Sequence, residues 1–93
     1  MSIKNRLEEL FLRKKPLKLF MSIPKESTKY ISVLSKEADC TYSHTVKILE
    51  ELKKLGLIKF EKRGRIKFVS LTQDGKEVAT IFEHLLRKFT SMR

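Results

Sequence analysis

The stretch that decides the fold covers residues 41–71 and reads TYSHTVKILEELKKLGLIKFEKRGRIKFVSL. Its first half repeats apolar residues every three or four positions, which predicts a helix over about residues 42–55 with one buried face. The residues of that face are Thr45, Ile48, Leu49, Leu52 and Leu55. Thr41 suits the N-cap, and Gly56 suits the residue just beyond the helix, where a positive φ is common. The opposite face carries Ser43, Val46, Lys47 and Glu50.

The second half of the stretch alternates apolar and charged residues, as the two half-buried strands of a hairpin do. A three-residue loop at 62–64 sets Phe60 opposite Ile66 and keeps one face apolar, whereas a two-residue loop at 63–64 mixes the faces. We therefore expect the longer loop, with Gly64 in the left-handed conformation that a bulged turn requires. In this register Lys59 lies opposite Lys67. Because opposed like charges destabilise a strand pair, an anion is expected between them.

The rest of the chain completes one small, mainly α domain over residues 1–93. Apolar spacing predicts four further helices, at residues 2–14, 17–23, 32–37 and 73–90. Tyr30 and Ile31 favour a brief third strand beside the hairpin, and Thr72 can cap the last helix. Two helices joined by a tight turn at residues 39–40 form a helix-turn-helix over about 32–55. The hairpin over about 57–71 would be its wing, so the order predicts a winged helix-turn-helix.

The charge of the chain favours a polyanionic partner. Lys and Arg number 21 against 11 Asp and Glu, giving a net charge of +10, and a field of this size draws nucleic acid toward the chain. A basic surface that only keeps the chain soluble is the alternative interpretation. The basic residues are concentrated in the hairpin, at Lys59, Lys62, Arg63, Arg65 and Lys67. This concentration favours nucleic acid.

Several classes of protein are not expected from this sequence. Cys40 is the only cysteine and no apolar run approaches 18 residues, so we expect a cytoplasmic protein without an intrachain disulfide or a membrane span. A basic helix lying on anionic lipid is an alternative that Glu8 and Glu9 oppose. Cys40 and His44 have a spacing that metal ligands use, but only His84 and scattered carboxylates could complete a site. We expect no metal, no cofactor and no enzyme activity, because no phosphate loop or catalytic set is present.

Both ends of the chain carry more apolar surface than a domain of this size needs. In the last helix the stripe consists of Val78, Ile81, Phe82, Leu85, Leu86 and Phe89. In the first helix it consists of Ile3, Leu7, Leu10 and Phe11. Surplus apolar surface of this kind marks an interaction site. We therefore expect a homodimer held by the two terminal helices.

Part of the chain, about residues 17–85, resembles the MarR- and ArsR-like winged helix-turn-helix regulators, especially small archaeal members. The resemblance is carried by Leu34 to Ala38, a turn, Thr41-Tyr42-Ser43-His44, Leu52 before Gly56-Leu57-Ile58, a basic hairpin, and Leu71-Thr72-x-x-Gly75. It implies a dimer whose 42–55 helix enters the major groove of DNA while the wing around Arg63 reaches the adjacent minor groove or its phosphates. The chain lacks the long flanking helices that form an effector pocket in full-length MarR proteins. The resemblance therefore implies no particular small-molecule effector.

The sequence as a whole favours a homodimeric, sequence-specific regulator of transcription that binds double-stranded DNA and is nucleoid-associated. The candidate helix contacts are Thr41, Tyr42, Ser43, His44, Val46 and Lys47. Val46 could meet a thymine methyl group, and the varied polar set beside it suits base recognition. Two alternatives stay open: an architectural or chromatin protein that binds DNA with little sequence preference, and a winged helix that makes protein contacts within transcription or replication machinery.

Overall fold

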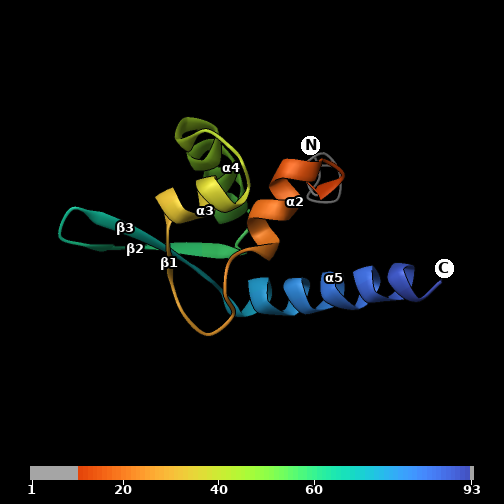
Figure 1. Cartoon of the computed structure of the whole chain (residues 1–93). Coiled ribbons are helices and arrows are strands. Elements are labelled where there is room, and N and C mark those ends of the chain that lie inside the picture. Colours follow the sequence, from red (N-terminus) through yellow and green to blue (C-terminus); the bar gives the residue numbers. More distant parts are fainter. Residues whose placement is uncertain (1–10, 93) are drawn as a thin grey trace.

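A computed structural model describes residues 11–92 of the 93-residue chain (Figure 1). Its helices are α2 (Lys14–Met21), α3 (Ile31–Glu37), α4 (Tyr42–Lys54) and α5 (Gln73–Ser91). Its strands are β1 (Lys29–Tyr30), β2 (Ile58–Arg63) and β3 (Ile66–Leu71). The strands form one antiparallel sheet in the order β1-β3-β2. This is the expected winged helix-turn-helix, with α3 and α4 as the helix-turn-helix and β2 and β3 as the wing.

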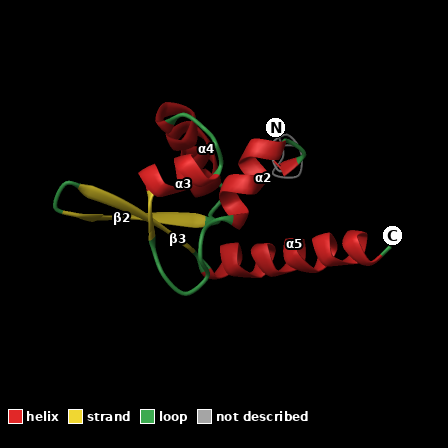
Figure 2. Cartoon of the chain, viewed as in Figure 1, coloured by secondary structure: helices red, strands yellow, loops and turns green. Residues whose placement is uncertain are grey.

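The hydrophobic core lies between α2, α3 and α4 and the base of the sheet (Figure 2). The largest fully buried side chains are Leu19, Phe20, Leu34, Thr45, Leu49, Leu52 and Val69. Thr45 is tolerated in this core because its hydroxyl donates a hydrogen bond of 2.8 Å to the Thr41 carbonyl. The predicted inner face of α4 is thus confirmed, with Leu55 half-buried at its end.

Two threonine caps fix where the long helices begin. The Thr41 hydroxyl accepts the His44 amide at 3.2 Å, and the Thr72 hydroxyl accepts the Gly75 amide at 3.0 Å. Both caps agree with the sequence prediction. Thr72 also donates its hydroxyl hydrogen to the Gly56 carbonyl at 2.6 Å, and Gly56 has the expected positive φ of 79°. The start of α5 is therefore tied to the loop between α4 and the wing.

The predicted register of the hairpin is wrong. β2 and β3 are joined by two residues, Gly64 and Arg65, so that Phe60 lies opposite Val69 and not opposite Ile66. Gly64 has a φ of 63°, and a glycine at the first position is typical of a two-residue type II′ loop. The inward side of β3 is formed by Val69 and Leu71, which are 0% and 3% exposed. This register wins because it buries these two side chains over the core.

Smaller differences concern the ends of the other elements. The predicted 2–14 helix lies almost wholly outside the described residues; of its last residues, Phe11 is helical, and Leu12 and Arg13 form a turn. The second helix begins at Lys14 rather than residue 17, because Pro16 in the first turn gives up no hydrogen bond. The third strand is present one residue earlier than expected, at Lys29–Tyr30. No helix in the described part is long and apolar enough to cross a membrane.

Candidate nucleic-acid interface

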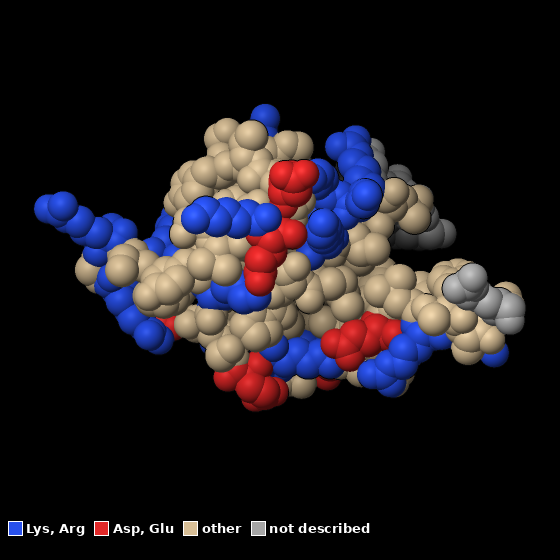
Figure 3. All heavy atoms as spheres, viewed as in Figure 1, with Lys and Arg blue, Asp and Glu red and all other residues tan. Residues whose placement is uncertain are grey.

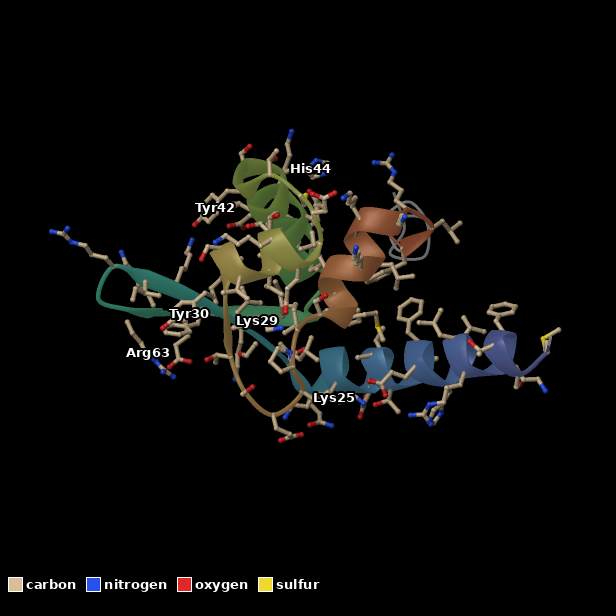
Figure 4. All side chains as sticks on the ribbon, viewed as in Figure 1. Lys25, Lys29, Tyr30, Tyr42, His44 and Arg63 are labelled. Atoms are coloured by element: carbon tan, nitrogen blue, oxygen red, sulfur yellow. The ribbon has the colours of Figure 1, made fainter. Side chains whose placement is uncertain are left out.

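The first turns of α4 present polar side chains to solvent. Tyr42, Ser43, His44 and Lys47 are all exposed, and Figure 4 shows Tyr42 on the side of α4 toward the wing and His44 on the side toward α2. Two of the six candidate helix residues have other roles. The Thr41 hydroxyl is engaged in the cap, and Val46 is half-buried against the core rather than exposed.

The turn between α3 and α4 is held by a lysine from α2. Lys15 Nζ donates to the Ala38 carbonyl at 2.8 Å and also to the Asp39 carbonyl. These carbonyls lie at the end of α3, where the helix dipole favours a positive charge. Asp39 itself has a φ of 52°, and Cys40 then donates its amide to the Ser35 carbonyl at 2.9 Å. Lys15 thus holds the turn that orients α4. No local sequence pattern predicts this role.

On its side toward α4 the wing carries two opposed lysines. Lys62 and Lys67 lie directly opposite each other, both exposed. Lys67 Nζ is 4.9 Å from the centre of the Phe60 ring, and Lys53 of α4 approaches the same ring at 5.5 Å. The expected pairing of Lys59 with Lys67 is therefore wrong, since Lys59 faces Ser70. Two lysines do lie opposite each other, as expected, but the pair is Lys62 with Lys67, which is the second pair from the loop rather than the third.

The other side of the wing carries a stack of three side chains. The Arg63 guanidinium lies 4.7 Å from the centre of the Phe68 ring, and that ring lies 4.8 Å from the ring of Tyr30. Arg63 also donates to Glu61 Oε1 from Nε at 3.2 Å and from Nη2 at 3.1 Å. Figure 4 shows Arg63 on the side of the hairpin away from Tyr42 and His44. Arg63 and Arg65 are both exposed, but Arg63 is engaged with its neighbours in the wing, whereas Arg65 lies in the loop.

The apolar stripe of α5 divides into a covered part and an uncovered part. Val78 and Phe82 pack against the core, and the Phe82 ring lies 5.1 Å from that of Phe11. Phe11 is itself buried within the domain. The uncovered residues are Ile81, Leu85, Leu86 and Phe89, which are 45–65% exposed, together with Met92. Of the other predicted dimer contacts, Ile3, Leu7 and Leu10 lie outside the described residues.

The placement of α5 depends on the loop before β1. Lys25 Nζ lies 3.0 Å from Thr80 Oγ1 and 3.0 Å from Glu83 Oε2. Figure 1 shows α5 running beneath α2 and extending past it, so that its last turns project from the body. Leu12, at 84% exposed, adds a further apolar side chain at the start of the described chain. The apolar face of α5 is thus fixed in position but has no neighbour over its last turns among residues 11–92.

Charges are unevenly distributed over the surface. Figure 3 shows Lys and Arg gathered at the tip of the wing and over the start of α2, with a few acidic side chains between them. Further acidic side chains lie over α5 and the loop before β1. Within residues 11–92, no three His, Cys, Asp or Glu side chains are grouped as metal ligands would be. The arrangement suits a long, negatively charged partner that spans α4 and the wing.

The fold is similar to several solved structures. AF1382 from Archaeoglobus fulgidus is 22% identical over 90% of this chain and 96% of its own, with a TM-score of 0.79. The MarR family transcriptional regulator SPO1453 from Silicibacter pomeroyi is 19% identical over 95% of this chain, which spans 64% of that regulator, with a TM-score of 0.77. Mb0332 from Mycobacterium bovis, a homodimeric winged helix-turn-helix DNA-binding domain and a possible ArsR-family regulator, is 10% identical over 97% of this chain and 83% of its own, with a TM-score of 0.79. At these identities the likeness is one of fold, and it confirms the expected resemblance to MarR- and ArsR-like winged helices.

Sequence comparison places the chain more closely. Curated protein sequences gave no match. A family model matches residues 35–83, just over half of the chain. The matched segment runs from the end of α3 through the turn, α4 and the wing into the first half of α5. It contains the exposed face of α4 and the paired strands of the wing, but not α2, β1 or the last turns of α5. The chain therefore belongs to the family described as the DUF6293 C-terminal winged helix domain.

Proposed function

We propose that this protein is a homodimeric, sequence-specific regulator of transcription that binds double-stranded DNA. The helix α4 enters the major groove, and the wing contacts the neighbouring phosphates or minor groove. The observation that carries the proposal is the outer face of α4, where Tyr42, Ser43, His44 and Lys47 stand exposed while the opposite face is buried. A helix that is held rigidly and displays varied donors and acceptors is suited to reading base edges.

The wing supports this placement with charge. Lys62 and Lys67 extend from its side toward α4, and Arg65 lies at the tip. Phosphate contacts position a protein on the duplex without carrying sequence information. We assign Lys62, Lys67 and Arg65 to phosphates. Arg63 has a different part, since its bonds to Glu61 and its stacking on Phe68 hold the wing in shape.

The dimer is supported by the uncovered face of α5. Ile81, Leu85, Leu86 and Phe89 form exposed apolar surface along the middle and the end of this helix. A second copy of the chain would cover this face by two-fold symmetry, which is the commonest arrangement in homo-oligomers. Mb0332, which has the same fold, is homodimeric. Two α4 helices related by such an axis would read half-sites about 34 Å apart, so the preferred site should be an inverted repeat.

The test compares a selected site with scrambled DNA. Fragments bound by the purified protein are selected, and the best duplex and a scrambled duplex are titrated with wild type, Ser43→Ala and Lys47→Ala. If Lys47 reads a guanine, Lys47→Ala should cost on the order of 1–3 kcal/mol on the selected site and much less on the scrambled one. Lys88→Ala, at the far end of α5, is the control and should bind as wild type does.

The outcomes separate the alternatives. Equal losses on both duplexes for Ser43→Ala and Lys47→Ala would make α4 a phosphate clamp, and an architectural DNA-binding protein would then replace the regulator. Failure of the wild-type protein to bind either duplex would exclude both readings and leave a winged helix that contacts other proteins.

A further inference from the structure

We propose that the start of α2 forms a second DNA phosphate site, in which Arg13 and Lys14 hold the backbone on the side of α4 away from the wing. This inference rests on the proposed function and extends the interface to an element that neither the family match nor the helix-turn-helix includes. It assigns a role to basic side chains for which the fold itself gives no reason.

The site is an open hollow between two helices. A cavity of about 410 Å³ lies between the start of α2 and the outer face of α4. Its lining consists of Arg13, Lys14, Lys15, Pro16, His44, Lys47, Ile48 and Glu51. Arg13 also borders a broader hollow of about 990 Å³ that follows the outer face of α4 past Ser43 to Lys54. The start of α2 is therefore continuous with the surface that would enter the major groove.

The side chains of this hollow carry an excess of positive charge. Arg13, Lys14 and Lys47 are exposed, and none forms a side-chain hydrogen bond or ion pair with another residue of the described 11–92 segment. Lys15 differs, because it is bound to the carbonyls at the end of α3. Glu51 is the acid of the lining, and it also lies 3.8 Å from Lys54. Three cations around one hollow repel one another, and an anion between them would relieve that repulsion.

Folding does not explain the two residues of α2. Its first turn contains no acidic side chain, and basic side chains at that end of a helix are opposed by the dipole. Lys14 and Arg13 thus slightly destabilise the helix that they begin. By contrast Lys15, with the same unfavourable position, is compensated by its bonds to Ala38 and Asp39. Among residues 11–92 nothing offsets this cost for Arg13 and Lys14, and an external anion between them would do so.

The position of the hollow indicates which anion fits. Figure 1 shows the wing and the start of α2 on opposite sides of α4, and Figure 3 shows basic side chains gathered at both places. The major groove is about 12 Å wide and is bordered by a phosphate backbone on each side. A duplex that receives α4 in this groove would meet the wing along one backbone and Arg13 and Lys14 along the other. The DNA backbone is therefore preferred over a small free anion.

The experiment measures how the affinity for DNA depends on salt. The full chain carrying Arg13→Gln and Lys14→Gln together is titrated with the selected duplex between about 50 and 200 mM salt. Each lost phosphate contact makes the log-log slope shallower by about 0.9, so the double variant should lose about 1.8 per protomer. Its preference for the selected over the scrambled duplex should stay unchanged, because phosphate contacts carry no sequence information.

Two matched variants control for charge and folding. Arg87→Gln with Lys88→Gln removes the same charge from exposed positions near the end of α5 and should keep the wild-type slope. Arg13→Lys with Lys14→Arg keeps the charge and should also keep it. Thermal unfolding of all variants checks that the domain is intact.

A wild-type slope for the Arg13→Gln, Lys14→Gln variant would overturn the inference while leaving the proposed function in place, provided that Lys47→Ala still lowers sequence preference. An unchanged slope together with a lost response to inorganic phosphate in calorimetry would show a small-anion site instead. Failure of wild type to bind DNA would overturn the inference and the proposed function together.

Discussion

Replacing Gly75 by alanine tests how closely α5 is packed on the base of the wing. Gly75 lies in the first turn of α5, is buried and has no positive φ. Its backbone therefore accepts alanine, and in an isolated helix the substitution would be stabilising by roughly 1 kcal/mol. In the domain, however, an added Cβ would lie 1.9 Å from the Leu57 carbonyl oxygen and 3.3 Å from Leu71 Cδ2. The two effects have opposite signs, so the sign of the result decides between them.

The expected magnitude follows from the contact. The Leu57 carbonyl oxygen is backbone and accepts the Thr72 amide at 3.0 Å, so it cannot move without breaking the cap region of α5. Overpacking of this kind costs typically about 3 kcal/mol at its upper end. After the gain in helix propensity, Gly75→Ala should be destabilised by about 2 kcal/mol. For a domain of this size the melting temperature falls by roughly 4–8 °C for each kcal/mol.

The assay is thermal and urea unfolding of wild type, Gly75→Ala and Glu77→Ala. Glu77 is exposed in the same helix, and its replacement should change the free energy of unfolding by less than about 0.5 kcal/mol. If Gly75→Ala is as stable as wild type or more stable, then the first turn of α5 does not lie against Leu57 as described, and the orientation of α5 would have to be revised.

Three further predictions concern the interface. Leu85→Glu should give a monomer in analytical ultracentrifugation at micromolar concentration, because a charge on the uncovered face of α5 cannot be buried against a second copy; an unchanged dimer mass would place the contact elsewhere. Lys15→Met should lower the free energy of unfolding by about 1.5–3 kcal/mol, since two carbonyls lose a charged donor, and a wild-type urea midpoint would show that the turn does not need this lysine. Lys62→Gln with Lys67→Gln should make the salt dependence of DNA binding shallower by about 1.8 per protomer, whereas Arg63→Gln should change it less because Glu61 already pairs with the guanidinium; a larger effect from Arg63 would reverse the assignment of the two wing faces.

These three predictions have controls within the chain. Lys14→Met is the control for Lys15→Met. Lys14 makes no side-chain hydrogen bond or ion pair with residues 11–92, so its replacement should leave stability unchanged or slightly higher. Arg87→Ala serves the ultracentrifugation experiment, because Arg87 is exposed and lies on the other side of α5 from Leu85. Lys88→Gln serves the salt titrations, because it is exposed and lies away from α4 and the wing.

Local sequence patterns predicted the structure correctly where the relevant residues lie within one helix or at its ends. The period of buried residues in α4, the threonine caps and Gly56 are all present as the sequence predicts, because each depends on neighbours within four residues. The wing register failed for a reason that is visible in the sequence afterwards. Phe68 and Val69 are adjacent and both apolar, so either phase of alternation could face the core. Burial of Val69 with Leu71 over the core decides between them, and Phe68 then packs on the other side against Tyr30 of β1.

The residues that the sequence did not reveal act over long distances. Lys15 contacts carbonyls 23 and 24 residues away, and no pattern of spacing predicts such a contact. Arg63 was expected at the DNA because it is basic and lies near the tip of the wing. Its engagement with Glu61 and Phe68 depends on which face of the strand it occupies, and that face follows from the register.

The stack of Arg63, Phe68 and Tyr30 adds a second link between the wing and the helix-turn-helix, beside the pairing of β1 with β3. Tyr30 is the N-cap residue of α3, so the wing is fastened through its outer face to the first helix of the helix-turn-helix. If the protein binds DNA as proposed, the distance from the tip of the wing to α4 is set before the duplex binds. In such a domain the separation between the wing and α4 is fixed. It would favour DNA sequences whose groove already has the matching width. Other sequences would bind only if the duplex is flexible enough to deform to that width.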